Sequence, residues 1–230
     1  MTKILIFDTE TTGLPKSYTV NYNVLNLWPH IVQFSYIIYD CHSKRLIKIQ
    51  DDIIKVPKEI NISEECTNIH GITNELSQTQ GIQIEVAIKE FMDDIKTVDL
   101  VVAHNMEFDL NLLKVEIMRK VTDNLINSEK KETNLKYLNV LSKEMNYYCT
   151  MQNSIQLCNI KRMNKKGKEY TKFPKLSELH EKLFQIIPHN LHNSLNDVLV
   201  CLRCFYKLKY DDDLMDRDNE FQCRMNKLIL

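Results

Sequence analysis

The stretch KILIFDTETTGL, residues 3–14, decides the fold of this chain. It begins with a short, continuous apolar run, which is typical of a buried central strand. The run ends at Asp8 and Glu10, which are two residues apart, so their side chains can leave the same face. We therefore predict a first strand over residues 4–7, followed by a turn, with two carboxylates at the end of the strand.

The pair Asp8 and Glu10 has two interpretations. If both carboxyl groups were ionised side by side they would repel, and one would normally keep its proton. A divalent cation removes this conflict, and Mg²⁺ is often held by one or two carboxylates together with a substrate phosphate. The alternative is two solvated acids at a strand end, and the pair alone does not decide between them.

The remaining chain predicts strands first, then alternating strands and helices, then closing helices. Runs of β-branched and aromatic residues favour strands, and apolar residues at helical spacing favour helices. We expect strands at residues 31–39, 46–54, 100–103 and 147–151, and helices at residues 63–70, 82–96, 105–118, 176–186 and 195–208. This order predicts an α/β fold with a mixed central β-sheet flanked by α-helices. Residues 122–145 stay open between loop, helix and insertion.

Composition and length predict one domain. The 230 residues are 43% apolar, which suits a single core, and 30 basic residues nearly balance 31 acidic ones, so any basic surface must be local. No apolar run approaches the roughly 20 residues of a membrane helix, and the N-terminal run is too short for a signal peptide. Together with seven irregularly spaced cysteines, this predicts a soluble, intracellular protein without a membrane partner, in cytoplasm or nucleus.

Three more residues lie in contexts that fit the first pair. Asp109 follows the predicted strand at 100–103, one turn into a helix that Asn105 is placed to cap. His192 and Asp197 lie where the chain enters the helix over residues 195–208. Taken singly, each has an ordinary interpretation: a first-turn acid that favours the helix dipole, a surface histidine and a capping aspartate.

Together these residues resemble the three motifs of the DEDDh family. These are RNase H-like 3′–5′ exonucleases, and they include the proofreading subunit of bacterial DNA polymerase III. The matching segments are FDTETTGL at 7–14, AHNMEFD at 103–109 and HNSLND at 192–197, with IHGIT at 69–73, CTM at 149–151 and PKL at 174–176. The resemblance covers residues 3 to about 207 in the family's order. Ser194, where many relatives have Ala, and His30, where Arg often precedes the second strand, depart from it.

The resemblance implies an RNase H-like fold and a metal-dependent 3′–5′ exonuclease that releases 5′-nucleoside monophosphates. The implied ligands of two Mg²⁺ or Mn²⁺ ions are Asp8, Glu10, Asp109 and Asp197. His192 would be the base that takes a proton from the attacking water. The implied substrate contacts are Thr11, Gly13, Leu14, His70 and Asn105. For His70 and the adjacent Gly71, a purely structural turn is the alternative.

Two segments carry local charge of opposite sign. Residues 161–175 hold seven basic side chains and one acid, Glu169, interleaved with Tyr170 and Phe173. This pattern suits a flexible arm that grips phosphates and stacks bases, and a solvated loop is the alternative. The arm residues assigned to the substrate are Lys165, Lys166 and Lys168.

The chain is predicted to divide into an exonuclease domain, residues 1–209, and an acidic C-terminal tail, residues 210–230. The tail is either a solvated helix or a disordered end. Its last ten residues are apolar enough to dock on a partner or on the domain itself, and the sequence does not choose.

The expected substrate is the 3′ end of nucleic acid, with single-stranded DNA favoured over RNA and with a role in proofreading or repair. Three alternatives remain from the sequence. One is a catalytically inactive nucleic-acid-binding module of the same fold. Another is a polymerase-associated subunit, whose polymerase partner would be a separate protein. The third is an RNA-trimming 3′–5′ exoribonuclease.

Overall fold

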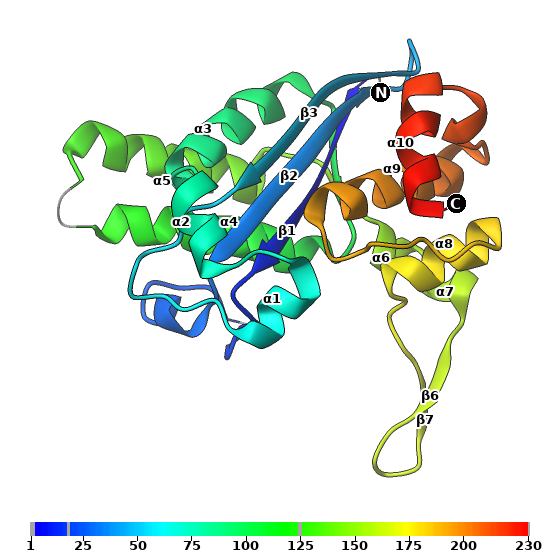
Figure 1. Ribbon diagram of the computed structural model, residues 1–230, viewed down its shortest axis with the longest axis horizontal. Helices are drawn as coiled ribbons and strands as arrows, with labels where there is room; N and C mark the ends of the chain where they lie inside the picture. Colours follow the sequence, from blue (N-terminus) through cyan, green and yellow to red (C-terminus); the bar gives the residue numbers. More distant parts are fainter. Residues whose placement is uncertain (1–2, 18, 124–125, 230) are drawn as a thin grey trace.

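A mixed five-stranded sheet forms the centre of the computed structural model, which describes residues 3–17, 19–123 and 126–229 (Figure 1). The strands are β1 (Lys3–Thr11), β2 (Ile31–Asp40), β3 (Arg45–Ile53), β4 (Leu100–Ala103) and β5 (Tyr147–Cys149). Their order in the sheet is β3-β2-β1-β4-β5. The strand β1 runs antiparallel to β2 and parallel to β4, and β4 runs parallel to β5. The predicted α/β fold with a mixed central sheet is confirmed.

Helices cover both faces of the sheet (Figure 1). The α-helices are α1 (Glu64–His70), α2 (Asn74–Gln80), α3 (Ile84–Asp94), α4 (Met106–Thr122), α5 (Ser128–Lys143), α6 (Thr150–Asn153), α7 (Ile155–Cys158), α8 (Leu176–Phe184), α9 (Ser194–Tyr210) and α10 (Asn219–Ile229). Short 3₁₀ helices lie at η1 (Leu25–Leu27), η2 (Ile95–Thr97) and η3 (Leu214–Asp216). One face packs on α3, α4 and α5, and the other packs on α8, α9 and α10.

The alternation of β1 assigns its side chains to these two layers. Leu5 and Phe7 lie in the core with α3 and α4, whereas Ile4 and Ile6 lie in the core with α9. The strand is longer than the predicted apolar run, because pairing with β2 continues to Thr11. The two carboxylates therefore lie within the strand, and by the same alternation they leave it on the α9 face.

Two other segments differ in extent from the sequence predictions. The described part of residues 122–145 is mostly the helix α5, whose N-cap Asn127 accepts a hydrogen bond from the backbone N–H of Lys130. The predicted strand at 147–151 ends at Cys149, and α6 begins at Thr150. The hydroxyl of Ser154 donates to the carbonyl of Thr150, and this bond supports the early turn.

The basic segment forms a hairpin that projects from the rest of the chain (Figure 1). Its strands are β6 (Lys161–Met163) and β7 (Glu169–Thr171), paired antiparallel. The side chain of Asn164 accepts hydrogen bonds from the backbone of Lys166 and Lys168, and Gly167 supplies a φ of 75°. The sequence predicts a flexible arm, with a solvated loop as the alternative, and does not indicate the two strands and the ordered turn that the structure has here.

The C-terminal segment packs on the domain. Phe221, Met225 and Leu228 of α10 are buried in the same cluster as the apolar face of α9. The acid Asp213 accepts two hydrogen bonds from the guanidinium of Arg203, at 3.0 and 2.6 Å. Of the two arrangements that the sequence left open for the apolar end, the described residues adopt docking on the domain itself. Among the described helices, none has the length and apolarity needed to cross a bilayer.

We predict that Phe221→Ala lowers the free energy of unfolding by about 3 kcal/mol, because it opens a cavity at a site with no exposure. Urea denaturation followed by circular dichroism measures the change. Gln222→Ala, on the exposed side of α10, is the matched control and should leave the denaturation midpoint unchanged. Equal midpoints for the two variants would show that α10 does not contribute to the core.

Candidate active site

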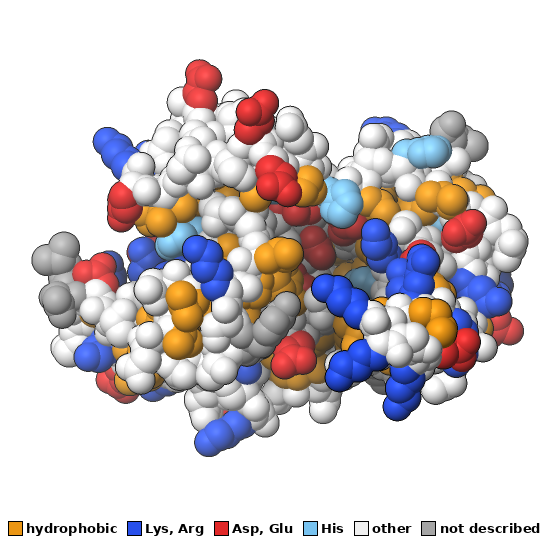
Figure 2. All heavy atoms as spheres, turned by 90° about the horizontal axis from the view of Figure 1, so that it is seen from below, with side chains coloured by type: hydrophobic (Ala, Val, Ile, Leu, Met, Phe, Trp, Pro, Cys, Tyr) orange, Lys and Arg blue, Asp and Glu red, His pale blue; other side chains and the backbone are white. Residues whose placement is uncertain are grey.

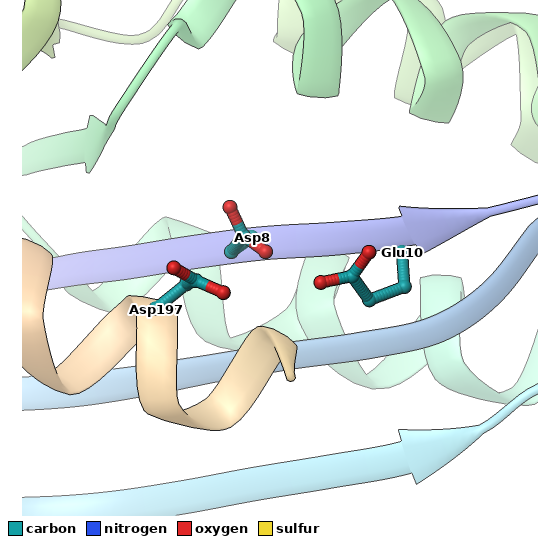
Figure 3. Close-up of side chains that lie close together, drawn as sticks. All are labelled: Asp8, Glu10 and Asp197. Atoms are coloured by element: carbon teal, nitrogen blue, oxygen red, sulfur yellow. The ribbon is translucent and has the colours of Figure 1, made fainter. Parts of the chain in front are cut away.

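Three carboxylates meet between β1 and the first turn of α9. Figure 2 shows acidic side chains in a hollow of the surface, and Figure 3 shows the carboxylates of Asp8, Glu10 and Asp197 directed into the same space. One oxygen from each lies within 4.8 Å of the others. Asp8 and Glu10 share a face of β1 because of its twofold alternation, and Asp197 is placed by the start of α9. The set offers only oxygen ligands, which suits Mg²⁺ or Mn²⁺.

Asp109 approaches this group from the opposite layer. It lies in the first turn of α4 and is 2% exposed. Its Oδ1 accepts hydrogen bonds from the hydroxyl of Thr9 at 2.7 Å and from the backbone N–H of Thr9 at 3.2 Å. Thr9 lies between the two β1 acids and faces the other way, so it holds Asp109 beside them. The structure thus brings three of the four predicted ligands into one group and places the fourth next to it.

Burial raises the pKa values of all four acids, and neighbouring carboxylate charge adds to the shift for Asp8, Glu10 and Asp109. Burial, followed by the charges of Asp109, Asp197 and Glu10, raises the pKa of Asp8 well above its ordinary value. Burial and then the charges of Asp197 and Asp109 raise the pKa of Glu10 to about 8. Burial also raises the pKa values of Asp109 and Asp197 to about 7, opposed by their hydrogen bonds to Thr9 and His192. A cation in this space would compete with protons for the carboxyl oxygens, as cations do at metal sites with acidic ligands.

His192 is held directly before α9 by its backbone. It adopts a φ of 71°, and its N–H donates to Oδ2 of Asp197 at 2.8 Å. The next residue, Asn193, caps α9 by accepting a hydrogen bond from the backbone of Asn196. The side chain of His192 is exposed, and its imidazole makes no hydrogen bond within the described residues. The backbone contact therefore keeps the histidine beside the carboxylates while its ring stays free.

A comparison with protein families now adds to this geometry. The sequence profile of the RNase_T family, described as an exonuclease family, matches residues 5–205. The chain belongs to this exonuclease family. The predicted resemblance to DEDD-type 3′–5′ exonucleases of RNase H-like fold is confirmed, and so is the prediction of an exonuclease-family hydrolase.

Solved structures of exonuclease I are similar to this exonuclease domain in fold. Exonuclease I without ligand has a TM-score of 0.60 and 15% identity, over 94% of this chain and 44% of that chain. Exonuclease I of E. coli in complex with a dA16 oligonucleotide has a TM-score of 0.60 and 16% identity, over 94% of this chain and 42% of that chain. The exonuclease I of Methylocaldum szegediense has a TM-score of 0.57 and 15% identity, over 97% of this chain and 45% of that chain. The chain spans less than half the length of these proteins. A comparison with curated protein sequences found no significant match.

In this exonuclease domain, a buried polar network seats the start of α9 on β2. The side-chain oxygen of Gln33 accepts from the N–H of Ser194 at 3.2 Å and from the amide of Asn193 at 3.4 Å. The amide of Gln33 and the hydroxyl of Ser35 both donate to Oδ1 of Asp51, at 2.7 Å each. Since the hydroxyl hydrogen of Ser35 is directed at Asp51, the hydroxyl of Ser194 donates to Ser35. The network links two strands, β2 and β3, to the start of α9 through buried and part-buried hydrogen bonds.

Sequence reasoning missed the members of this network on the sheet. Gln33 and Ser35 stand in a run that is otherwise apolar, and that contrast is the signal that marks buried polar positions. Ser194 was noted only as a departure from the family's usual Ala. In the structure, the hydroxyl of Ser194 donates a hydrogen bond to the hydroxyl of Ser35. An alanine at position 194 could not make this bond.

The segment after β1 carries the predicted substrate contacts. The hydroxyl of Thr11 donates to the carbonyl of Gly13 at 2.6 Å, and Gly13 adopts a φ of 146°. Leu14 is 82% exposed, which is unusual for a leucine of an ordered turn. The structure therefore presents an apolar side chain to solvent at the end of the strand that carries the acids.

His70 lies against this segment. Its Nδ1 accepts from the N–H of Ile72 at 3.1 Å, and α1 ends at Gly71 with a φ of 78°. Burial lowers the pKa of His70, and a backbone hydrogen bond with Thr11 opposes the shift. These contacts fit the structural turn, and they also place the imidazole beside the segment predicted to meet the substrate.

The second motif contributes a half-buried histidine, His104, that is neutral near pH 7. Burial lowers the pKa of His104 to about 4, opposed by its hydrogen bond to Pro174. Its Nε2 donates to the carbonyl of Pro174 at 3.1 Å, so its Nδ1 accepts from the hydroxyl of Thr150 at 2.9 Å. Asn105 does not cap α4 as predicted, because it adopts the left-handed region with a φ of 68° and makes no side-chain capping bond. Its side chain is left for other contacts.

The three predicted arm lysines lie away from the carboxylates. Lys165, Lys166 and Lys168 are exposed in and beside the turn of the β6–β7 hairpin. Figure 2 shows lysine and arginine side chains around this projection, next to the hollow that holds acidic side chains. The three lysines therefore lie on the projecting hairpin and are separate from the group of predicted metal ligands.

We predict that the metal-free protein loses stability as the pH rises. The folded-state pKa values of the acids are raised, so their contribution is fully present below the ordinary carboxyl pKa and is lost as the pH passes about 8. In chelator, the denaturation midpoint should fall between about pH 5 and about pH 8, and Mg²⁺ should raise it more at the higher pH. The double variant Asp8→Asn, Glu10→Gln is the control and should reduce both effects. An unchanged response to Mg²⁺ in this variant would contradict the metal assignment.

We predict that Gln33→Met slows nuclease turnover about tenfold, because the start of α9 loses two hydrogen bonds that align His192 and Asp197. Gln50→Met, on the neighbouring strand β3, is the matched control and should turn over at the parent rate. Circular dichroism checks that both variants fold. Equal rates for the two variants would show that the network does not position the site.

Proposed function

We propose that this chain removes nucleotides from the 3′ end of nucleic acid by metal-dependent hydrolysis, releasing 5′-nucleoside monophosphates. The observation that supports this best is the convergence of Asp8, Glu10 and Asp197 in one hollow, with Asp109 held beside them by Thr9. Buried carboxylates with raised pKa values are costly to a fold, and they mark functional sites more often than structural ones. Membership of the exonuclease family supplies the reaction class.

The proposed cofactors are two Mg²⁺ or Mn²⁺ ions held by Asp8, Glu10, Asp109 and Asp197. When bound, such ions offset the charge of the phosphodiester and stabilise the attacking and leaving oxygens. The oxygen-only donor set fits them, and the four acids carry more negative charge than one divalent ion would balance. The hydrogen bonds from Thr9 and from the backbone of His192 keep one oxygen of Asp109 and one of Asp197 oriented.

His192 is the proposed general base. Its imidazole stands free at the rim of the hollow, and its backbone is fixed to Asp197, so the ring can accept a proton from the attacking water. Imidazole suits this role because histidine gains and loses protons near neutral pH. Leu14, exposed at the end of β1, is proposed to pack on the terminal base, with Thr11, Gly13, His70 and Asn105 lining the same end.

The proposed substrate is single-stranded DNA. Two similar exonuclease I structures hold dA16 and dT13 oligonucleotides, although these proteins are longer than this chain. Lys165, Lys166 and Lys168 add positive charge beside the hollow, which favours phosphate binding. A role in proofreading or repair, and a polymerase partner, stay predictions from the sequence. A preference for RNA would depend on how the site treats the 2′-hydroxyl.

Hydrolysis of 3′-labelled oligonucleotides tests the proposal. We expect the parent protein to shorten single-stranded DNA from the 3′ end with Mg²⁺, to do so more slowly on matched RNA, and to stop when chelator is added. Asp8→Ala should abolish the activity, and His192→Ala should lose about 100-fold or more while Mn²⁺ binding persists. Degradation by Asp8→Ala at the parent rate would overturn the metal site, and normal turnover by His192→Ala would exclude the base. An inactive parent that still binds DNA would favour a binding module.

A further inference from the structure

The two faces of the β6–β7 hairpin differ in chemistry. The register pairs Arg162 with Tyr170, and the flanking pairs are Lys161 with Thr171 and Met163 with Glu169. Directly opposed residues share a face, and successive pairs alternate between faces. Arg162 and Tyr170 therefore stand on one face, and the two flanking pairs stand on the other.

Charge is neutralised on the second face. The Nζ of Lys161 donates to the hydroxyl of Thr171 at 2.8 Å and lies 4.0 Å from a carboxylate oxygen of Glu169. Glu169 is the only acid between residues 161 and 175. On the first face, the guanidinium of Arg162 makes no hydrogen bond or ion pair within the described residues. Tyr170 beside it is 48% exposed. This face thus presents a free cation next to an uncovered aromatic ring.

The base of the hairpin is anchored at the active site. The carbonyl of Pro174 accepts from His104 of the second motif, next to Asn105. Lys172, which follows β7, forms an ion pair with Glu178 of α8 at 2.7 Å. Lysine and arginine side chains over the hairpin border the hollow that contains acidic side chains (Figure 2). A strand of nucleic acid that leaves the hollow on this side would meet the hairpin.

We propose that the Arg162–Tyr170 face binds the single-stranded part of the substrate upstream of its 3′ end. This inference rests on the proposed exonuclease function and adds a second contact to it. Arg162 would bind a phosphate, and Tyr170 would stack on an unpaired base, as in proteins that bind single strands without sequence preference. A duplex covers its bases and offers mainly phosphates, so it gains nothing from an exposed tyrosine.

The choice of a single strand rests on Tyr170, whose exposed ring can stack on an unpaired base. Met163 is also exposed, but it stands on the second face and is not part of the proposed contact. The Arg162–Tyr170 pair is the middle of the three strand pairs of a hairpin that projects from the rest of the chain (Figure 1). We therefore expect the contact to meet the substrate outside the hollow, where a very short substrate would not reach it.

The test compares two double variants that each remove one cation and its cross-strand partner. Arg162→Ala with Tyr170→Ala removes the first face, and Lys161→Ala with Thr171→Ala is the matched control on the second. Binding of a long oligo(dT) is measured by fluorescence anisotropy in the Asp8→Ala background, so that no substrate is consumed. We expect Kd to rise about tenfold for the first variant and less than about twofold for the control, as the loss of one stacked base implies. With Asp8 intact, the two double variants should hydrolyse a trinucleotide at the same rate.

Three outcomes would overturn the proposal. These are equal weakening by both variants, no weakening by either, and a larger loss on a blunt duplex than on oligo(dT). Circular dichroism checks that each variant keeps the parent fold, and Tyr170→Phe, which keeps the ring, should bind nearly as well as the parent. Because binding is measured without catalysis, failure of the proposed function is seen separately, as a parent protein that does not hydrolyse the trinucleotide.

Discussion

Repulsion among buried carboxylates is the constraint on which the rest of this structure depends. Burial raises the pKa values of Asp8, Glu10, Asp109 and Asp197, and neighbouring charge adds to the shift for the first three, so their assembly costs folding free energy. A helix layer on each face of β1 supplies the apolar burial that offsets this cost. A divalent cation would reverse the sign of the local interaction, which is why the fold can keep the acids together for function.

Two sets of hydrogen bonds hold acids from separate helix layers next to the strand β1. Thr9 faces α4 and fixes Asp109, while Gln33 and Ser194 join β2 to the start of α9, which carries Asp197. Both sets use the alternation of a strand, because neighbouring residues must serve opposite faces. The consequence is a group of acids held by a strand and two helices, with the exposed His192 hydrogen-bonded through its backbone to Asp197.

The central strand and the local motifs were predictable because they depend on neighbouring residues. The apolar run before Asp8 indicated a buried strand, and helical spacing indicated α3. Other details failed because pairing energies act over distance: β1 extends to Thr11 because β2 offers partners, and β5 stops at Cys149 because a helical turn begins there. Asn105 is a favourable capping residue in isolation, but the chain enters α4 in the left-handed region, which withdraws its side chain from the capping position.

The sequence by itself determined the order and spacing of the acidic motifs, the exonuclease family and the α/β class, because periodicity and motif chemistry are local properties. Only the tertiary structure decided that Asp51 supports the start of α9, that the described part of the C-terminal segment docks on the domain, and that the basic hairpin has one neutralised and one free face. Each of these depends on contacts between residues far apart in the chain or on strand register. A pattern of residue types leaves such contacts open, because many pairings satisfy the same pattern.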